Sequence, residues 1–188
     1  MSEHKDGAGS VAQADFAALA ADGTLAGHWV LDPAGSRAEF HIKHFWGAMT
    51  VHGSFTRLSG EADVSADGSI TATLTMDATS VNTKNKRRDK HLRSADFFDV
   101  EQHPNMVLTV TGAKPAGPAT LAGQGGLEAA GRAQPVEFTA RVEEATAQAV
   151  VLRAEIEVDR TRFGMTWSPL RMSAPKARGI VTARFVRA

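Results

Sequence analysis

Three histidines lie close together in one short stretch of the chain, at His41, His44 and His52. Imidazole side chains bind zinc and act as acids or bases near neutral pH. His41 and His44 are three residues apart, and on a strand this odd spacing puts them on opposite faces, so they cannot bind one ion together. His41 and His52 can share a face, but two histidines make an incomplete zinc site. We expect no metal and no other cofactor.

The motifs of common enzyme classes are missing from the sequence. It contains no Gly-x-Ser-x-Gly turn, no phosphate-binding loop and no His-Glu-x-x-His, and it has no cysteine. One catalytic alternative is a small enzyme that acts on an apolar substrate, with His44 as the acid or base. His44 otherwise predicts a polar contact to the head of a ligand or a structural hydrogen bond. We expect a binding protein with no catalytic residues.

Composition narrows the class of protein further. Lysine plus arginine and aspartate plus glutamate both number 21, and this balance is unlike the basic excess of nucleic-acid binders. Nothing approaches the roughly 20 apolar residues of a spanning helix. The first residues are charged and the following alanine-rich stretch is interrupted by Gln13 and Asp15, unlike a signal peptide. We therefore expect a cytoplasmic protein; removal of a leader would instead make it periplasmic or secreted.

The chain divides into an N-terminal extension and one domain. We expect residues 1–27 to form a flexible extension, in which 12–21 is either a short helix or disordered, and residues 28–188 to form the domain. From Trp29 onward, short runs of alternating apolar and polar residues are separated by glycine-rich turns. This pattern is typical of an all-β sandwich or barrel, and about eight strands can be counted.

Two hairpins predict specific strand registers. A two-residue loop at Gly47-Ala48 would pair Phe40 with Phe55, Ile42 with Gly53 and His44 with Val51, which gathers the apolar residues on one face. A three-residue loop at 67–69 would place Leu74 opposite Ala62 and Met76 opposite Gly60, with Gly68 supplying a positive φ.

One strongly charged segment, residues 82–94, interrupts the β pattern. Asn82 or Thr83 can cap a helix there, so we expect a short surface helix or a loop. Its cations are either a solvated face or a contact for a phosphate head group or an anionic membrane surface. They are Lys84, Lys86, Arg87, Arg88, Lys90 and Arg93.

Several ordered blocks resemble the YceI-like family, whose members are lipocalin-like barrels described as polyisoprenoid-binding. The most specific block runs over residues 80–104 and contains Arg88-Asp89-Lys90-His91-Leu92-Arg93-Ser94 and then Asp96-Phe97-Phe98-Asp99-Val100. A second block, Arg160-Thr161-Arg162-Phe163-Gly164, is similar to the family's late Arg-x-x-Phe-Gly signature. The resemblance covers roughly residues 29–186, and it departs from the family pattern in the threonine-poor stretch 126–136 and at His103, where an aromatic is common.

The resemblance implies a single antiparallel eight-stranded lipocalin-like barrel with a short charged helix between strands and an N-terminal tail. Small inward residues such as Gly53, Ala62 and Ala140 would leave room for a ligand, although the same alternation also suits a dry packed core. Aromatic and methionine residues near turns predict either the mouth of the barrel or ordinary caps on its core. The expected ligand-binding residues are Phe40, Ile42, His44, Phe45, Trp46, Met49, Val51, Phe55, Leu74, Met76, Leu92, Phe97, Phe138, Phe163, Met165 and Trp167.

The function that follows is non-catalytic binding of a long apolar lipid inside the barrel. The resemblance implies a polyisoprenoid or isoprenoid quinone as partner, with the protein as carrier, storage protein or scavenger. Transient contact with a membrane surface is a further expectation. A homodimer is a candidate assembly because the family often dimerises, and a purely structural dimer through strand edges is a third hypothesis.

Overall fold

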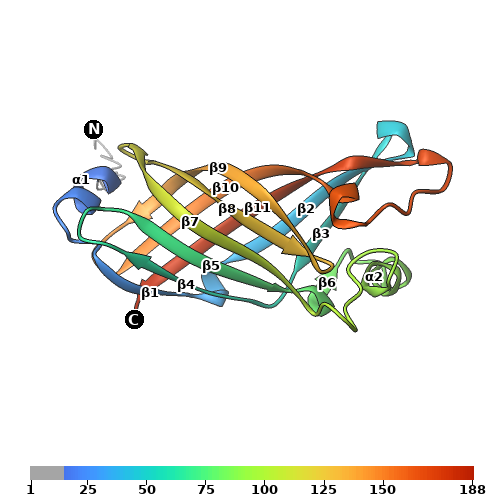
Figure 1. The fold of residues 1–188 in the computed structure, drawn as a ribbon, viewed down its shortest axis with the longest axis horizontal. Coiled ribbons are helices and arrows are strands. Elements are labelled where there is room, and N and C mark those ends of the chain that lie inside the picture. The colour runs from blue at the N-terminus through green and yellow to red at the C-terminus, as the bar shows by residue number, and fades with distance from the viewer. Residues whose placement is uncertain (1–14) are drawn as a thin grey trace, which may run out of the picture.

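Eleven strands form one antiparallel sheet in the part of the chain that the computed structural model describes, residues 15–188 (Figure 1). In chain order they are β1 (Gly27–Leu31), β2 (Arg37–His44), β3 (Met49–Phe55), β4 (Leu58–Val64), β5 (Ile70–Asp77), β6 (Val81–Asn82), β7 (Asn105–Gly117), β8 (Thr120–Ala129), β9 (Arg132–Ala145), β10 (Ala149–Asp159) and β11 (Ser173–Arg187). Two α-helices, α1 (Phe16–Ala21) and α2 (Lys86–Arg93), accompany them.

The sheet closes on itself because β11 pairs with β1, the first strand of the strand order, as well as with β10. Eight strands form the ring β1-β4-β5-β7-β8-β9-β10-β11, and β11 also pairs with β1. The other three strands prolong existing positions in the wall. β2 pairs with β11 beyond β1, β3 pairs with β2 beyond β4, and β6 pairs with β3 beyond β5. The barrel therefore has eight wall positions, three of which are occupied by two strands in succession, and the predicted fold class is confirmed.

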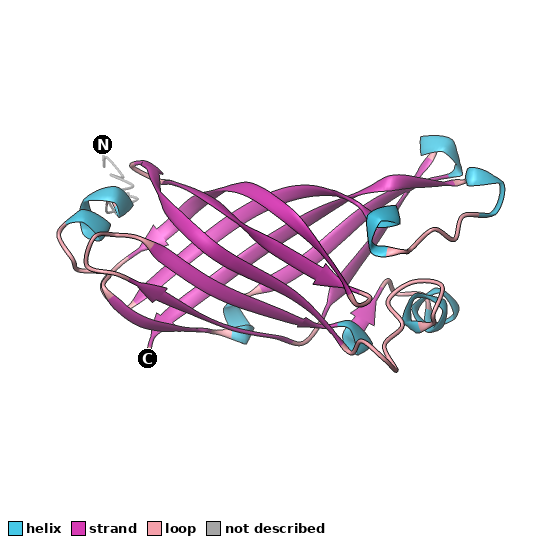
Figure 2. Cartoon of the chain, in the orientation of Figure 1, coloured by secondary structure: helices cyan, strands magenta, loops and turns pink. Residues whose placement is uncertain are grey.

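Most helices and short helical turns lie at the two ends of the barrel, and one turn, Pro33–Gly35, lies partway along the wall between β1 and β2 (Figure 2). At one end, which we call the closed end, α1 and the C-terminal end of β11 lie together (Figure 1). At the other, the mouth end, α2 lies beside β6. Two further turns project there, at Phe45–Gly47 and Pro169–Arg171. Within residues 15–188, no helix is long and apolar enough to cross a membrane.

The helix α1 packs against the barrel. Asp15 caps it by accepting a hydrogen bond from the Ala18 amide at 3.1 Å, and the Phe16 amide donates to the Pro118 carbonyl at 2.9 Å. Phe16 and Ala20 are buried in the same cluster as Leu25. The expected extension over residues 1–27 is thus folded from residue 15 on, and its first 14 residues lie outside the described part. Of the two alternatives for residues 12–21, the helix is found from Phe16.

Both predicted hairpin registers are wrong by two residues, although the faces are right. In the first hairpin Phe40 lies opposite Gly53, Ile42 opposite Val51 and His44 opposite Met49. The loop has four residues and contains a helical turn, in which the Ala48 amide donates to the Phe45 carbonyl at 3.1 Å. A shift of two leaves every side chain on the same face, so face separation could not reveal the error.

The second hairpin also has a longer loop than predicted. Gly60 lies opposite Leu74 and Ala62 opposite Ala72, around a five-residue loop over 65–69. The loop is closed by the Ser65 amide, which donates to the Ser69 carbonyl at 2.8 Å. The predicted positive φ of Gly68 is confirmed, at 79°.

Candidate functional site

The interior of the barrel contains two small apolar cavities. The lower cavity lies toward the closed end, has a volume of about 120 Å³, and is lined by hydrophobic side chains alone. Phe16, Leu25 and Trp29 belong to its lining, and the Trp29 indole donates to the Leu25 carbonyl at 2.9 Å. The segment before β1 therefore closes this end of the interior.

The second cavity, which we call the upper cavity, lies nearer the mouth end and has a volume of about 100 Å³. Met76 and Met165 are among its predominantly apolar lining residues. Leu108, Ile156 and Val181 line both cavities, so the two lie end to end with these three side chains between them. The inward face of the wall thus provides an apolar path along the barrel that side chains interrupt.

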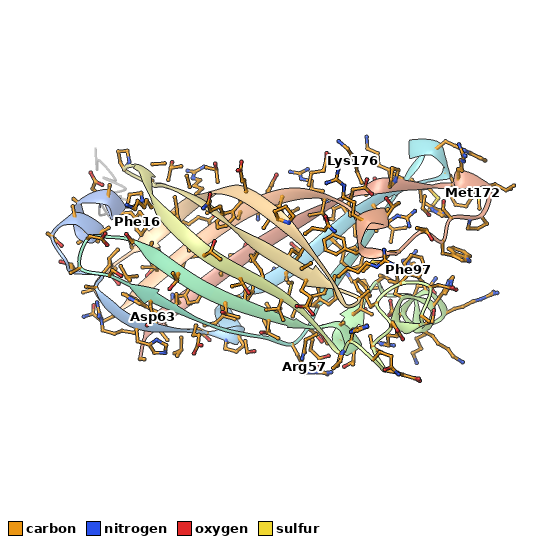
Figure 3. The ribbon with its side chains drawn as sticks, in the orientation of Figure 1. Phe16, Arg57, Asp63, Phe97, Met172 and Lys176 are labelled. Atoms are coloured by element: carbon orange, nitrogen blue, oxygen red, sulfur yellow. The ribbon has the colours of Figure 1, made fainter. Side chains whose placement is uncertain are left out.

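A larger cleft of about 650 Å³ lies at the mouth end, between α2 and the ends of β2, β3 and β11. It shares Phe40, Ile42 and Phe97 with the upper cavity. Unlike the lower cavity, it also has polar lining residues, which are His44, Asn85, Arg87, Arg88, His91, Arg160 and Ser173. Figure 3 shows Phe97 and Met172 at this end and Phe16 at the opposite one. A molecule with an apolar tail and a polar end would find matching surroundings in this order.

His44 faces the mouth cleft, at the top of β2. Its Nδ1 lies 2.6 Å from the Ser173 hydroxyl, at the start of β11, and its ring packs edge-on against Phe45 with centroids 4.4 Å apart. The hydrogen bond joins the two strands where their register is irregular. Of the two roles expected for His44, the structural hydrogen bond is present in this structure.

A cluster of three rings connects the two sides of the mouth cleft. His91 of α2 packs edge-on against Trp167 at 4.4 Å between centroids and against Phe97 at 5.1 Å. His91 Nε2 also lies 2.8 Å from a carboxylate oxygen of Asp96. His91 could not be identified as a site residue from the sequence, because its ring partner Trp167 lies 76 positions further along the chain and no local pattern links them.

The basic residues of α2 fall into two groups. Arg88 and Arg93 form hydrogen bonds within the protein: Arg88 donates to the Thr83 hydroxyl at 2.8 Å and Arg93 to the Thr79 carbonyl at 2.8 Å. The other cations of this segment are exposed, namely Lys84, Lys86, Arg87 and Lys90. The expected solvated or anion-facing surface therefore consists of four side chains rather than six.

The start of α2 differs from the prediction. Asn85 caps the helix by accepting from the Arg88 amide at 3.0 Å, in place of Asn82 or Thr83. Thr83 is buried, and both its amide and its hydroxyl donate to the Asp89 carboxylate, at 2.8 and 2.6 Å. This bond ties the chain before the helix to the middle of the helix, so Thr83 cannot serve the first turn.

Arg160 is a buried cation at the boundary between the cleft and the upper cavity. Its guanidinium donates to the backbone carbonyls of Met165, Trp167, Ser173 and Ala174. Burial lowers the pKa of Arg160 from its ordinary value, and the neighbouring Asp159 acts in the opposite direction. Because the side chain gathers four carbonyls, it shapes the 164–174 segment that forms one side of the cleft.

Thirteen of the sixteen expected ligand-binding residues line a cavity or the cleft. Leu74 and Phe138 line the lower cavity, and most of the others line the upper cavity or the cleft. Phe45, Trp46 and Met49 line none of the three and are exposed at the tip of the β2–β3 hairpin. That any of the sixteen residues contacts a ligand stays a prediction.

His41 and His52 form a pair on the outer face of the β2–β3 hairpin. His41 lies directly opposite His52, with ring centroids 4.2 Å apart. Burial and the facing His52 lower the pKa of His41. Over residues 15–188, no group of three potential metal ligands is found.

The sequence matches known proteins across nearly the whole barrel. The YceI-like domain matches residues 29–184. A UPF0312 protein from Azotobacter vinelandii is 33% identical over 129 residues, which are 66% of this chain and 67% of that protein. A UPF0312 protein from Pectobacterium atrosepticum is 38% identical over 104 residues, 52% of each chain. The matched stretch thus spans from about half to two thirds of these relatives.

Solved structures share the fold at low sequence identity. BcnA from Burkholderia cenocepacia superposes with a TM-score of 0.74 at 18% identity, over 82% of this chain and 98% of that one. A polyisoprenoid-binding domain from Saccharophagus degradans gives a TM-score of 0.70 at 16% identity, over 85% and 98%. The family match over residues 29–184 and the shared barrel agree, and the chain belongs to the YceI-like family.

Proposed function

We propose that this protein binds one long apolar lipid, a polyisoprenoid or an isoprenoid quinone, without converting it. The tail lies along the barrel axis, and the polar end lies in the mouth cleft. The observation behind the proposal is the change in lining along this axis, from a wholly apolar lower cavity to a cleft with several polar side chains. The protein acts as a carrier, store or scavenger of the lipid.

Burial of the tail supplies the binding energy. Each CH₂ group moved from water into an apolar interior contributes about 0.8 kcal/mol, so a long tail needs no hydrogen bond to bind tightly. The two inner cavities are small, and a tail that reaches the closed end has to displace Leu108, Ile156 and Val181. Met76 and Met165 in the upper cavity favour this adjustment because methionine is unbranched and adapts to irregular shapes.

The family supports a lipid as ligand. The barrel from Saccharophagus degradans that shares this fold is described as a polyisoprenoid-binding domain. The lower cavity of the present chain has the apolar lining that such a ligand requires.

Native mass spectrometry of protein purified without detergent tests the proposal. We expect a mass increment from one retained lipid, and extraction should release an isoprenoid. Protein that is stripped by solvent and then offered a long-chain prenol should recover a one-to-one complex. An empty protein that also takes up no prenol would contradict the proposal.

The hydrogen bond between His44 and Ser173 favours a second candidate, an enzyme acting on the bound lipid. In this alternative His44 is the acid or base. Incubation with a prenol or its ester, followed by analysis of the extracted lipid, separates the two. Unchanged lipid supports the binding role. A chemically altered lipid whose formation stops in His44→Ala would establish the enzyme.

A further inference from the structure

Large exposed hydrophobic side chains gather at the mouth end. Among residues 15–188 six such side chains are exposed, and five of them lie in the β2–β3 hairpin tip or in the segment before β11. Trp46 and Leu170 are the most exposed, at 73% and 79%. The five are Phe45, Trp46, Met49, Trp167 and Leu170; the sixth is Val30, in β1. We call the five residues the apolar tip.

The backbone holds the two parts of the apolar tip side by side. The Trp46 amide donates to the Met172 carbonyl at 3.4 Å, and the two turns project together at the mouth end (Figure 1). Phe45, Trp46, Leu170 and Arg171 all have positive φ, between 50° and 53°. Bulky residues rarely adopt this conformation. It is a strained way to present apolar side chains to water, and strain of this kind gathers at functional sites.

Positive charge surrounds the apolar tip. The hairpin tip (residues 43–50), the segment before β11 (166–172) and the α2 region (82–93) together contain eight lysines and arginines and one acidic residue, Asp89. Asp89 is buried and accepts hydrogen bonds from Thr83. The rest of the sequence has 13 basic and 20 acidic residues, so these three segments are basic in a chain of zero net charge.

We propose that the mouth end docks on an anionic lipid bilayer, with the apolar tip in the interfacial layer and the exposed lysines of the α2 region against the head groups. This inference rests on the proposed function and names the partner at its site, since a lipid that leaves a bilayer at this surface enters the cleft directly. Aromatic side chains prefer the membrane interface, and basic clusters are attracted to anionic head groups. Both features occur together only at this end of the described chain.

Sedimentation with vesicles tests the docking. We expect the protein to bind vesicles of phosphatidylcholine and phosphatidylglycerol, to bind vesicles of phosphatidylcholine alone much more weakly, and to release from the anionic vesicles as salt is raised. Trp46→Ser combined with Leu170→Ser should weaken binding at least about tenfold, as should Lys86→Glu combined with Lys90→Glu. None of these four residues lines the cleft or the cavities.

Two control variants alter the same chemistry elsewhere. Val30→Ser changes the large exposed hydrophobic that lies outside the apolar tip within residues 15–188, and Lys114→Glu changes an exposed lysine of β7 near the closed end. Both should bind anionic vesicles as the parent does. Circular dichroism checks that every variant is folded.

Several outcomes would overturn the docking proposal. Equal binding to neutral and anionic vesicles would do so, as would control variants that lose as much affinity as the tip variants. A dimer in solution that buries Trp46, or binding of duplex DNA in place of vesicles, would assign the surface to another partner. Prenol uptake by the parent protein, measured in parallel, separates the two proposals. A parent protein that binds vesicles but no prenol contradicts the proposed function, whereas one that binds prenol but no vesicles contradicts the docking alone.

Discussion

Two aromatic rings of the barrel interior lie directly over glycines of the neighbouring strand. Phe40 is opposite Gly53 and Phe138 is opposite Gly123. A Cβ added at Gly53 would lie 2.2 Å from Cζ of Phe40, and one at Gly123 would lie 2.5 Å from Cζ of Phe138. The space above these glycines is therefore filled by protein. The prediction that Gly53 leaves room for a ligand is wrong, because the Phe40 ring from the facing strand takes the space.

Gly53→Ala should be clearly destabilising because the Phe40 ring has to move. We expect a loss of about 1–3 kcal/mol in the free energy of unfolding, as for other overpacked interiors. Phe40 also lines the cleft and the upper cavity, so prenol affinity should fall too. Urea unfolding measures the first effect. Gly112→Ala is the matched control, since nothing lies within 4 Å of its added Cβ. Equal losses in the two variants would contradict the explanation.

At the scale of elements, the mouth end depends on side chains that hold loops through backbone groups. Arg160 donates to four carbonyls, and Arg93 donates to the carbonyls of Thr79 and Val81. The charged segment 82–94 could be predicted as a helix or loop from its composition. Its cap could not, because Asn82, Thr83 and Asn85 are all suitable residues and the choice depends on Asp89 binding Thr83.

Replacing Arg160 should release the 164–174 segment. In Arg160→Met the buried carbonyls lose their donor, and we expect a loss of about 3 kcal/mol or more in the free energy of unfolding. Arg162→Met is the control, because Arg162 is exposed and lies in the same turn; its effect should stay within about 0.5 kcal/mol. Chemical denaturation of both variants gives the comparison. A loss of similar size for Arg162→Met would show that the carbonyl contacts are not the cause.

At the scale of the whole molecule, alternation along the chain was enough to predict which faces of the strands are apolar and that about eight strands form a sandwich or a barrel. The resemblance to the YceI-like family decided for the barrel. Alternation did not fix the hairpin registers, because loops of four and five residues hold pairings that a two-residue shift leaves on the same faces. Nor did it predict the break of three wall positions into two strands each. The interior is partly packed and partly hollow, because Leu108, Ile156 and Val181 separate two small cavities.

The position of Val181 between the cavities predicts how the barrel selects tail length. Val181→Phe should narrow the passage, so that affinity for a long prenol falls on the order of tenfold or more while a short prenol held in the cleft and upper cavity binds nearly as before. Thr182→Phe places the same ring at the next residue, on the opposite face of the strand. Titration of both variants with prenols of increasing length checks this. Parallel losses at all lengths for Val181→Phe would contradict the end-to-end arrangement.

The double role of β11 has a consequence for the order of events during synthesis. This strand pairs with β10, β1 and β2, yet it follows all of them in the chain. Until residues 173–187 have emerged, the edges of β1 and β10 stay unpaired and the apolar inner face is open along its length. Contacts between such distant segments form late in folding. Under the proposed function, a tail can be retained only after β11 is in place, so the barrel would be loaded once β11 has paired with β1 and β10.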